Sequence, residues 1–397
     1  MFKDIVHTLF AKFSSALLGF ATIVLVSHAL GAQGKGEQAI MVYNIYVLLL
    51  FFTLVGNSTL VYLYPRNRFK DIIVPSFLWI GLLSFALVMF FIVFDSMAPK
   101  YILVCIPVAV LAAISEINQF ILLGQQRIKQ ANRLKMIYPL VSFAYIGILF
   151  VFNAFDSVWD CMAGISLAYV CSLFYGMYLL KEDYGRLGWL NKGELSGSFR
   201  MLFRFGATKQ IGSIAQSLNY RLSFYLISFY CGDRLLGVYS NGASLGEAVM
   251  LFGTSLALVQ YSVLSNRKDE KDSKSLSWKM VKINTLFTFC ALTVLCLLPS
   301  SFYVFLFGEG FEDVVTVIRL LAMGILLLSI SSNFTQYFFS RGNFRITACA
   351  SLIGLVITLL LGFCLIPRYG ITGAAVTALA SYTVSFVIEL YYFLKWK

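Results

Sequence analysis

The sequence predicts an all-α integral membrane protein, and three observations support that prediction. Apolar residues make up 59% of the 397 residues and charged residues only 13%, whereas soluble domains are about half apolar and a quarter charged. The apolar residues form runs of about 20 residues or more, the length of a helix that crosses a bilayer. Lys and Arg gather in alternate connections between these runs. Soluble, disordered and small disulfide-rich proteins are therefore excluded.

Twelve apolar windows mark the expected transmembrane helices. They lie at residues 10–30, 38–64, 73–94, 101–124, 136–154, 158–180, 206–230, 236–263, 282–305, 314–340, 346–366 and 370–394. With this division, the side that holds both termini carries 25 of the 31 Lys and Arg residues, and the opposite side carries 5. Positive charge marks the cytoplasmic side. We therefore expect a multi-pass protein of a bacterial inner membrane with both termini in the cytoplasm.

The second half of the chain repeats features of the first. Gly31 and Gly36 follow the first window, and Gly232 and Gly237 follow the seventh at an offset of 201 residues. Glycine permits the tight turn that two antiparallel helices need. Twelve helices then divide into two pseudo-symmetric six-helix bundles around a central cavity. The expected division is an N-terminal bundle at 1–180, a cytoplasmic linker at 181–205 and a C-terminal bundle at 206–397.

The motifs that the chain lacks argue against an enzyme. The sequence has no G-x-x-x-x-G-K-[ST] and no H-E-x-x-H, and it has only two histidines, so nucleotide hydrolysis by a P-loop and zinc catalysis are not expected. The eight cysteines lie mostly in apolar runs and are interpreted as packing residues. No metal or cofactor is predicted. The net charge of +12 is spread over short loops, which indicates membrane topology and not a nucleic-acid partner.

Charged side chains inside the apolar windows are the first candidate functional residues, because a charge at mid-bilayer costs at least ~2.5 kcal/mol. Arg221 is interpreted either as a cation that binds an anionic headgroup or as half of an interhelical pair with Glu247 or Glu116. Both carboxylates are candidates for coupling to H+ or Na+, or for a structural role. Lys12 is a second candidate cation, and Glu389 is expected at the membrane interface.

Two further groups complete the candidate site. Arg204 and Lys209 precede the seventh window, where they form either a cytoplasmic basic vestibule or ordinary positive-inside anchors. Four amide side chains accompany the charged residues as further candidates: Asn57, Gln216, Asn219 and Gln260.

The chain resembles the Wzx-type polysaccharide flippases of the multidrug/oligosaccharidyl-lipid/polysaccharide exporter superfamily. The residues that carry the resemblance are Lys12, Leu30-Gly31 to Gly36, Cys231-Gly232 with Gly237-Val-Tyr239, Leu306 to Phe311 and Leu365-Ile-Pro-Arg-Tyr-Gly370 to Ala375. The resemblance implies alternating access and an undecaprenyl-pyrophosphate-linked oligosaccharide repeat unit, of O-antigen or capsule, as substrate. On this hypothesis Lys12 and Arg221 contact the pyrophosphate. The sugar hydroxyls are then contacted by four amides: Asn57, Gln216, Asn219 and Gln260. Membrane lipids, a polysaccharide polymerase and a chain-length regulator are the expected partners.

Two alternatives remain open. A cation-coupled small-molecule or drug antiporter of the same superfamily would need an acidic site, whereas Lys12 and Arg221 offset the acids here. A membrane-embedded polysaccharide polymerase or ligase would need a sizeable periplasmic loop, and every loop expected on that side is short. We therefore expect a transporter and not an enzyme.

Overall fold

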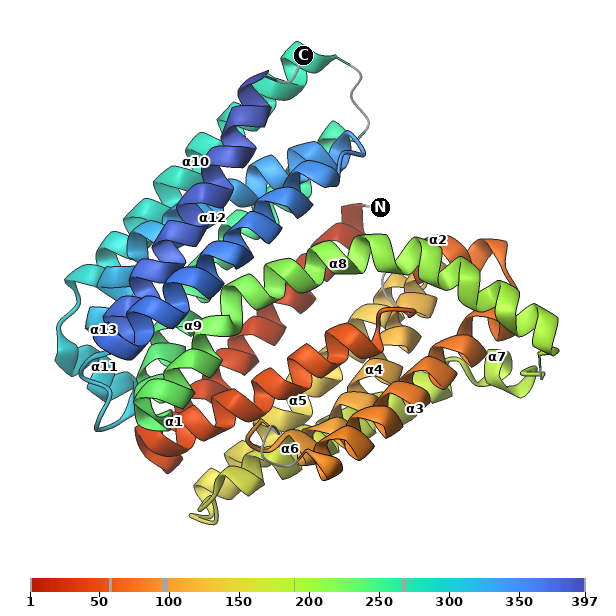
Figure 1. Cartoon of the computed structure of the whole chain (residues 1–397), viewed down its shortest axis with the longest axis horizontal. Coiled ribbons are helices and arrows are strands. Elements are labelled where there is room, and N and C mark those ends of the chain that lie inside the picture. The colour runs from red at the N-terminus through yellow and green to blue at the C-terminus, as the bar shows by residue number, and fades with distance from the viewer. Residues whose placement is uncertain (1, 57–58, 95–98, 189, 266–268, 396–397) are drawn as a thin grey trace. The chain divides into compact units, whose positions relative to one another are not determined.

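The computed structural model of the chain describes all residues except 1, 57–58, 95–98, 189, 266–268 and 396–397. The side chains of residues 2–7, 9, 207–209, 211 and 270 also lie outside the description. Every regular element in the described residues is a helix, which agrees with the all-α prediction (Figure 1). In chain order they are α1 (Phe2–Phe52), α2 (Leu60–Leu63), η1 (Tyr64–Arg66), α3 (Phe69–Val93), α4 (Ile102–Gly124), α5 (Ile128–Val151), α6 (Val158–Leu179), α7 (Lys181–Gly185), α8 (Lys192–Cys231), α9 (Asp233–Leu264), α10 (Glu270–Leu297), α11 (Ser300–Phe307), α12 (Val314–Ser340) and α13 (Arg345–Lys395).

Nine helices of the described chain are long and apolar enough to cross a membrane. Two of them, α1 and α13, contain 51 residues each and are interrupted by one glycine with positive φ, Gly31 (φ 62°) and Gly370 (φ 55°). Each is therefore two helices joined at a kink, because only glycine adopts this conformation without strain. Both kinks lie where the apolar windows predict a turn. A multi-pass membrane protein is confirmed, and the number of twelve crossings stays a prediction.

The chain divides into two compact units. The first contains residues 1–29 and 40–211, and the second contains 30–39 and 212–397. The boundary at residues 211 and 212 lies inside α8, which begins at Lys192 within the segment expected to be a linker.

In the first unit, α4 is the central helix. It packs against α3, α5 and α6, and its Ala112, Ala113 and Ile117 have 2% or less of their surface exposed. The first part of α8 also belongs to this unit. Its Phe203 packs edge-on against Trp79 of α3 at 5.6 Å between ring centroids. Gln210 donates a hydrogen bond to the carbonyl of Leu50 at 2.8 Å.

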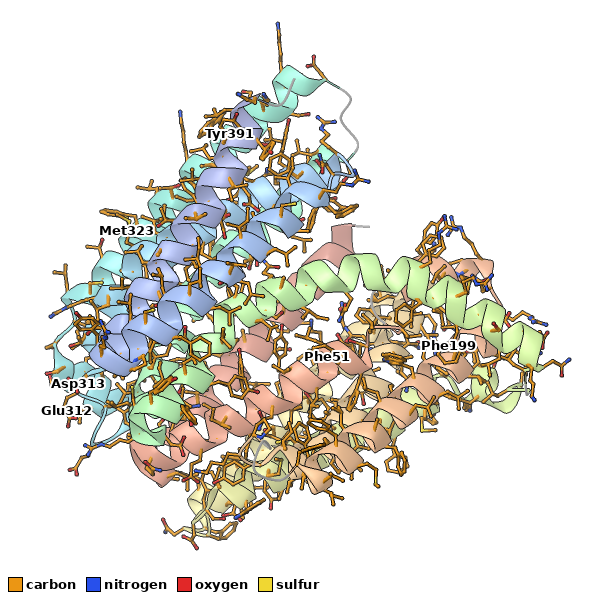
Figure 2. The ribbon with its side chains drawn as sticks, viewed as in Figure 1. Phe51, Phe199, Glu312, Asp313, Met323 and Tyr391 are labelled. Carbon is orange, nitrogen blue, oxygen red and sulfur yellow. The ribbon has the colours of Figure 1, made fainter. Side chains whose placement is uncertain are left out.

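In the second unit, α10, α12 and α13 lie side by side (Figure 1). A buried cluster fills one end of this unit, and its members are Leu264, Val281, Ile330, Phe334, Tyr337, Phe338 and Phe393. Met323 and Tyr391 project outward and are 57% and 50% exposed (Figure 2). Figure 2 also shows Glu312 and Asp313 at the end of this unit opposite Tyr391. Apolar side chains thus cover the flanks, as a lipid-facing surface requires.

The two repeated glycine turns contact each other within the second unit. A Cβ atom on Gly36 would lie 1.7 Å from the carbonyl oxygen of Asp233, and one on Gly237 would lie 2.0 Å from that of Ala32. Residues 32 and 36 are related to 233 and 237 by the offset of 201 found in the sequence. The contact is therefore reciprocal, as a pseudo-twofold relation between the two turns requires.

Candidate functional site

Arg221 of α8 pairs with Glu247 of α9. The Nη2–Oε1 distance is 2.5 Å, and the guanidinium lies 5.1 Å from the ring centre of Phe224. The side chains are 26% and 51% exposed, so the pair is not removed from water. Of the two carboxylates that the sequence offered as partners, the structure selects Glu247. A partly exposed pair can exchange its partners with a ligand at little cost, because its net contribution to stability is at most about 1 kcal/mol.

Two tyrosines, Tyr239 and Tyr382, lie close enough to this ion pair to be affected by its charges. Arg221 and Glu247 act electrostatically on the hydroxyls of Tyr239 and Tyr382. Tyr382 packs edge-on against Tyr220 at 5.6 Å, and the Tyr220 hydroxyl accepts a hydrogen bond from Gln216 at 2.9 Å. Gln216 is half-buried. The structure therefore brings Gln216, Arg221 and Glu247 into one neighbourhood of aromatic and polar groups.

Asn219 is only two residues from Arg221, but its side chain makes a different set of contacts. Its side chain is buried, and its Oδ1 accepts hydrogen bonds from Thr358 at 2.6 Å and Ser381 at 2.7 Å. Both donors belong to α13. Gly354 of the same helix lets the amide approach closely, because a Cβ there would lie 2.6 Å from Nδ2 of Asn219. Asn219 thus joins α8 to α13.

Gln260 is also enclosed between helices. It has no exposed surface, donates to Ser277 at 3.1 Å and accepts from Asn333 at 2.8 Å. Asn284 donates to Asn333 at 2.7 Å and to the carbonyl of Ser329 at 2.8 Å. Buried polar groups need such partners. The network joins α9, α10 and α12.

Glu389 is buried inside the second unit, and its expected place at the membrane interface stays a prediction. It is 3% exposed and accepts hydrogen bonds from Ser331 and from Thr335, the latter at 2.9 Å. The hydroxyl groups of Ser331 and Thr335 on α12 thus give its carboxylate partners inside the protein. No group of three His, Cys, Asp or Glu side chains in the described part of the chain is arranged to hold a metal ion.

In the first unit, Lys12 and Glu116 are both half-buried. Lys135 of α5, which the sequence did not single out, acts electrostatically on each of them. Asn132, one turn earlier in α5, donates a hydrogen bond to Thr8 of α1 at 2.9 Å. Lys135 resembles an ordinary positive-inside residue because it lies near the start of α5. In the sequence, only its spacing of three residues from the polar Asn132, which places both on one face of the helix, sets Lys135 apart from the other basic residues of this loop.

A stacked tyrosine pair adjoins these charges. Tyr138 and Tyr169 have ring centroids 4.5 Å apart, and Glu116 acts electrostatically on Tyr169. Tyr138 follows Lys135 by three residues, so both occupy one face of α5.

The remaining predicted residues are placed only in part. Arg204 is exposed on α8. Lys209 has its side chain outside the described residues, and Asn57 lies outside them entirely. A basic vestibule therefore stays a prediction.

A charged cluster outside the apolar windows fixes the start of α8. Arg68 forms two hydrogen bonds with Asp71, at 2.8 and 2.9 Å, and a third with Glu194 at 2.8 Å. Glu194 also accepts from the backbone of Asn191 at 3.1 Å. The hydrogen bond from Arg68 is the main reason that the pKa of Glu194 falls to about 2. Sequence inspection treats these residues as loop charges, so it misses the connection.

A second polar cluster holds α7 on the first unit. Gln125 donates to the hydroxyl of Tyr64 at 2.7 Å and to Asp183 of α7 at 2.9 Å. Arg127 donates to Gln125 at 2.9 Å and to the carbonyl of Leu179 at 2.8 Å. The segment after α6 is therefore attached to helix ends of the first unit, and its role as a linker stays a prediction.

Known proteins share both the sequence pattern and the fold. The chain is 26% identical to the capsular polysaccharide biosynthesis protein CapF of Staphylococcus aureus over 262 residues, and this aligned region covers 65% of each protein. It is 23% identical over 288 residues to a putative O-antigen transporter of Shigella flexneri, covering 71% of this chain and 66% of that protein. The chain thus spans slightly less than two thirds of the length of these relatives.

Two solved structures show the fold. The lipid II flippase MurJ, in an inward closed conformation, matches with a TM-score of 0.80 and 16% identity over 97% of this chain and 87% of that one. An inward-facing MATE multidrug transporter of the MOP superfamily matches with a TM-score of 0.75 and 13% identity over 96% and 94%. At this identity the likeness concerns the fold alone.

A family model described as "Polysaccharide biosynthesis protein" matches residues 98–316, more than half of the chain. Together with the relatives, this match confirms the resemblance inferred from the sequence. The chain belongs to the polysaccharide biosynthesis protein family of membrane proteins.

Proposed function

We propose that the chain is a flippase that moves an oligosaccharide repeat unit, linked to undecaprenyl pyrophosphate, from the cytoplasmic to the periplasmic leaflet. The observation that supports it most directly is the family membership, with relatives named as a putative O-antigen transporter and a probable low-salt glycan biosynthesis flippase of Haloferax volcanii. The shared fold with transporters agrees with the proposal. No catalytic step is included in it.

The chemistry of such a substrate explains the need for a protein. A diphosphate and several sugars cannot cross hydrocarbon unaided, because each unpaired charge or polar group costs several kcal/mol there. The protein lowers that cost by offering cations and hydroxyls along the path, while the lipid tail stays in the bilayer.

Arg221 and Lys12 carry the anion-binding role in this proposal. Arg221 is partly exposed and already separated from water on the Phe224 side, so an anion can replace Glu247 as its partner. Gln216 lies beside it and is suited to a sugar hydroxyl. Asn219 and Gln260 are assigned to helix packing instead, because their amides are enclosed by other side chains.

Alternating access drives the cycle in this proposal, coupled to H+ or Na+. Glu247 is a candidate coupling group because its partner changes when an anion binds Arg221. Glu116 is a second candidate, since it makes no hydrogen bond with any residue that the structure describes. A polysaccharide polymerase and a chain-length regulator are the proposed functional partners.

Mass spectrometry of lipid-linked saccharides tests the proposal, in cells with and without the gene and with the glycosyltransferases intact. We expect one undecaprenyl-pyrophosphate repeat unit to accumulate and surface polysaccharide to disappear when the gene is lost. Absence of any such lipid contradicts the proposal. Efflux of cationic dyes in the same strains would then test the antiporter alternative.

A further inference from the structure

We propose that Glu389 is the centre of a binding site for one monovalent cation, and that the hydroxyls of Ser331, Thr335 and Thr347 complete it. The site lies within the second unit, between α12 and the two arms of α13, and it includes none of the residues assigned to the substrate above. Binding of the cation does not depend on the proposed substrate, whereas any use of the cation to drive transport rests on the proposed function.

The two arms of α13 bring Thr347 and Glu389 to the same level. Two hydrogen bonds fix the register of the arms, and they join Ser385 to the carbonyl of Ala350 at 3.2 Å and Ser381 to that of Gly354 at 2.9 Å. The positions on one arm fall as those on the other rise, so the arms are antiparallel on either side of the kink at Gly370. One helical turn further, the same register places Glu389 opposite Thr347.

Helix α12 supplies two hydroxyl donors to the carboxylate. Glu389 accepts hydrogen bonds from Ser331 and from Thr335, the latter at 2.9 Å. Ser332 lies between these two in the sequence, but it donates to the carbonyl of Ser329 in its own helix at 2.6 Å. A carboxyl group that accepts from both neighbours has the hydrogen-bond pattern of the ionised form, and each hydroxyl oxygen keeps a lone pair for a further ligand.

The described part of the chain offers this carboxylate no counter-charge. Glu389 is 3% exposed, and hydroxyl groups are the only described side chains that act on it. Arg345 and Lys395, at the two ends of α13, are exposed. Tyr391 follows Glu389 by two residues and projects outward (Figure 2), which agrees with an inward direction for Glu389 about 200° away. A buried charge without a partner is costly, so the carboxylate needs a cation or a proton.

Thr347 is the second, independent observation that points to a ligand. It is 6% exposed, and its Oγ1 forms no hydrogen bond with any residue that the structure describes. It nevertheless lies close enough to the carboxylate of Glu389 to act on it. Folded proteins rarely leave a buried hydroxyl without a partner, because its desolvation is then not compensated. A cation bound between Thr347 and Glu389 satisfies the hydroxyl oxygen and the carboxylate at once.

The donors indicate which kind of cation the site takes. All of them are oxygen atoms, which hard cations prefer. A single carboxylate balances a single positive charge, whereas a divalent ion would leave a net charge buried. Phe386 and Leu390, on either side of Glu389 in the helix, pack against the buried apolar cluster. The surroundings therefore do not suit Mg²⁺, which usually keeps several of its water ligands.

The position of the site allows a cation to reach it from one side of the membrane. Thr347 lies two residues after the first residue of α13, and Glu389 lies six residues before the last. At 1.5 Å per residue these offsets are about 3 and about 9 Å. The connection between α12 and α13 is expected on the cytoplasmic side, so the cation would enter from the cytoplasm.

Sodium binding to the purified full-length protein in detergent tests the inference. Equilibrium dialysis with radioactive Na⁺ gives the affinity and the number of ions bound per chain. Thermal unfolding is followed in NaCl and in choline chloride at equal ionic strength, because choline is too large for the site. The proteins are wild type, Glu389→Gln, Thr347→Val and Ser332→Ala. Ser332→Ala is the matched control, since it removes a neighbouring hydroxyl of α12 that is bonded within its own helix.

We expect wild type to bind one Na⁺ more per chain than Glu389→Gln does. The unfolding midpoint of wild type should be higher in NaCl than in choline chloride, because the ion binds the folded state, and that of Glu389→Gln should be equal in both. Thr347→Val should bind Na⁺ roughly tenfold more weakly. In choline chloride it should be at least as stable as wild type, because an unpartnered buried hydroxyl is removed. Ser332→Ala should bind Na⁺ like wild type.

Equal numbers of Na⁺ bound by wild type and Glu389→Gln would overturn the inference. If the wild-type midpoint then changed between about pH 5 and 8 while that of Glu389→Gln did not, the carboxyl group would take a proton instead. Equal Na⁺ affinity of wild type and Thr347→Val would exclude the hydroxyl as a ligand and overturn the site too. None of these measurements includes the lipid-linked substrate, so the accumulation experiment decides the proposed function separately.

Discussion

Gly36 lies directly against the backbone of Asp233, and Gly237 makes the reciprocal contact with Ala32. A Cβ on Gly36 would lie 1.7 Å from the Asp233 carbonyl oxygen, far closer than non-bonded atoms approach each other. The two turns are equivalent in the repeat, so their mutual contact is a consequence of the repeat itself. Glycine is required here for the close approach of two backbones.

Gly36→Ala and Gly237→Ala should each destabilise the protein, because the added methyl group forces the turns apart. Overpacking of a tight contact costs about 1–3 kcal/mol. Gly81→Ala is the matched control, since nothing lies within 4 Å of a Cβ there and alanine is the better helix former. Thermal unfolding in detergent measures the difference. Equal midpoints for Gly36→Ala and Gly81→Ala would contradict the close contact.

Arg221→Ala should abolish export of the polysaccharide while the amount of protein in the membrane stays constant. A charge swap, Arg221→Glu with Glu247→Arg, restores the ion pair but moves the cation to α9. If Arg221 binds the anion, the charge-swapped protein should have an unfolding midpoint close to that of wild type but should not export polysaccharide. Export assays on Arg221→Ala and on the charge swap decide the question, and restored export in the swap would assign the pair to interhelical locking.

Gln260→Leu should lower the free energy of unfolding by about 1–3 kcal/mol, because Asn333 loses a partner in a fully buried site. Gln216→Leu is the comparison. Gln216 is half-buried and donates one hydrogen bond to Tyr220, so its loss should affect stability less. Export by folded Gln260→Leu protein should stay near the wild-type rate, whereas Gln216→Leu should reduce it. The opposite order of the two export rates would assign Gln260 to the substrate.

The cluster of Arg68 and Glu194 should make stability depend on pH in the acidic range. The hydrogen bond from Arg68 lowers the pKa of Glu194 from 4.5 to about 2. A group with a depressed pKa in the folded state stabilises the fold above its unfolded pKa, and that contribution is lost as pH falls toward the folded value. The unfolding midpoints of wild type and Glu194→Gln should therefore differ at pH 6 and converge between about pH 4.5 and 2. A difference that is independent of pH would exclude ionisation of Glu194 as the cause.

The sequence predicts the apolar helices and the two glycine kinks well, because bilayer thickness and glycine conformation are local constraints. Gly31 and Gly370 are visible in the sequence as breaks between apolar windows. The start of α8 at Lys192 is not predictable in this way, because its register depends on distant contacts from Trp79 and Leu50.

Site residues are harder to predict than helices because a polar side chain in an apolar window has two different uses. Gln216 and Gln260 look alike in the sequence, yet one lies beside the charged pair and the other closes a buried network. Only the facing helix distinguishes them. Lys135 shows the opposite error, because its position among topology-determining charges conceals its electrostatic effect on Lys12 and Glu116.

Residues 30–39 belong to the second unit, although they lie in the sequence between two segments of the first unit. The order of the two units along the gene therefore alternates. A cut anywhere between residues 180 and 206 would give two fragments and would leave one of the two contacting turns on each. The second fragment would lack Ala32 and Gly36 as packing partners for Asp233 and Gly237. Exchange of one half for that of a relative would therefore have to preserve the ten-residue segment 30–39, which the other half encodes.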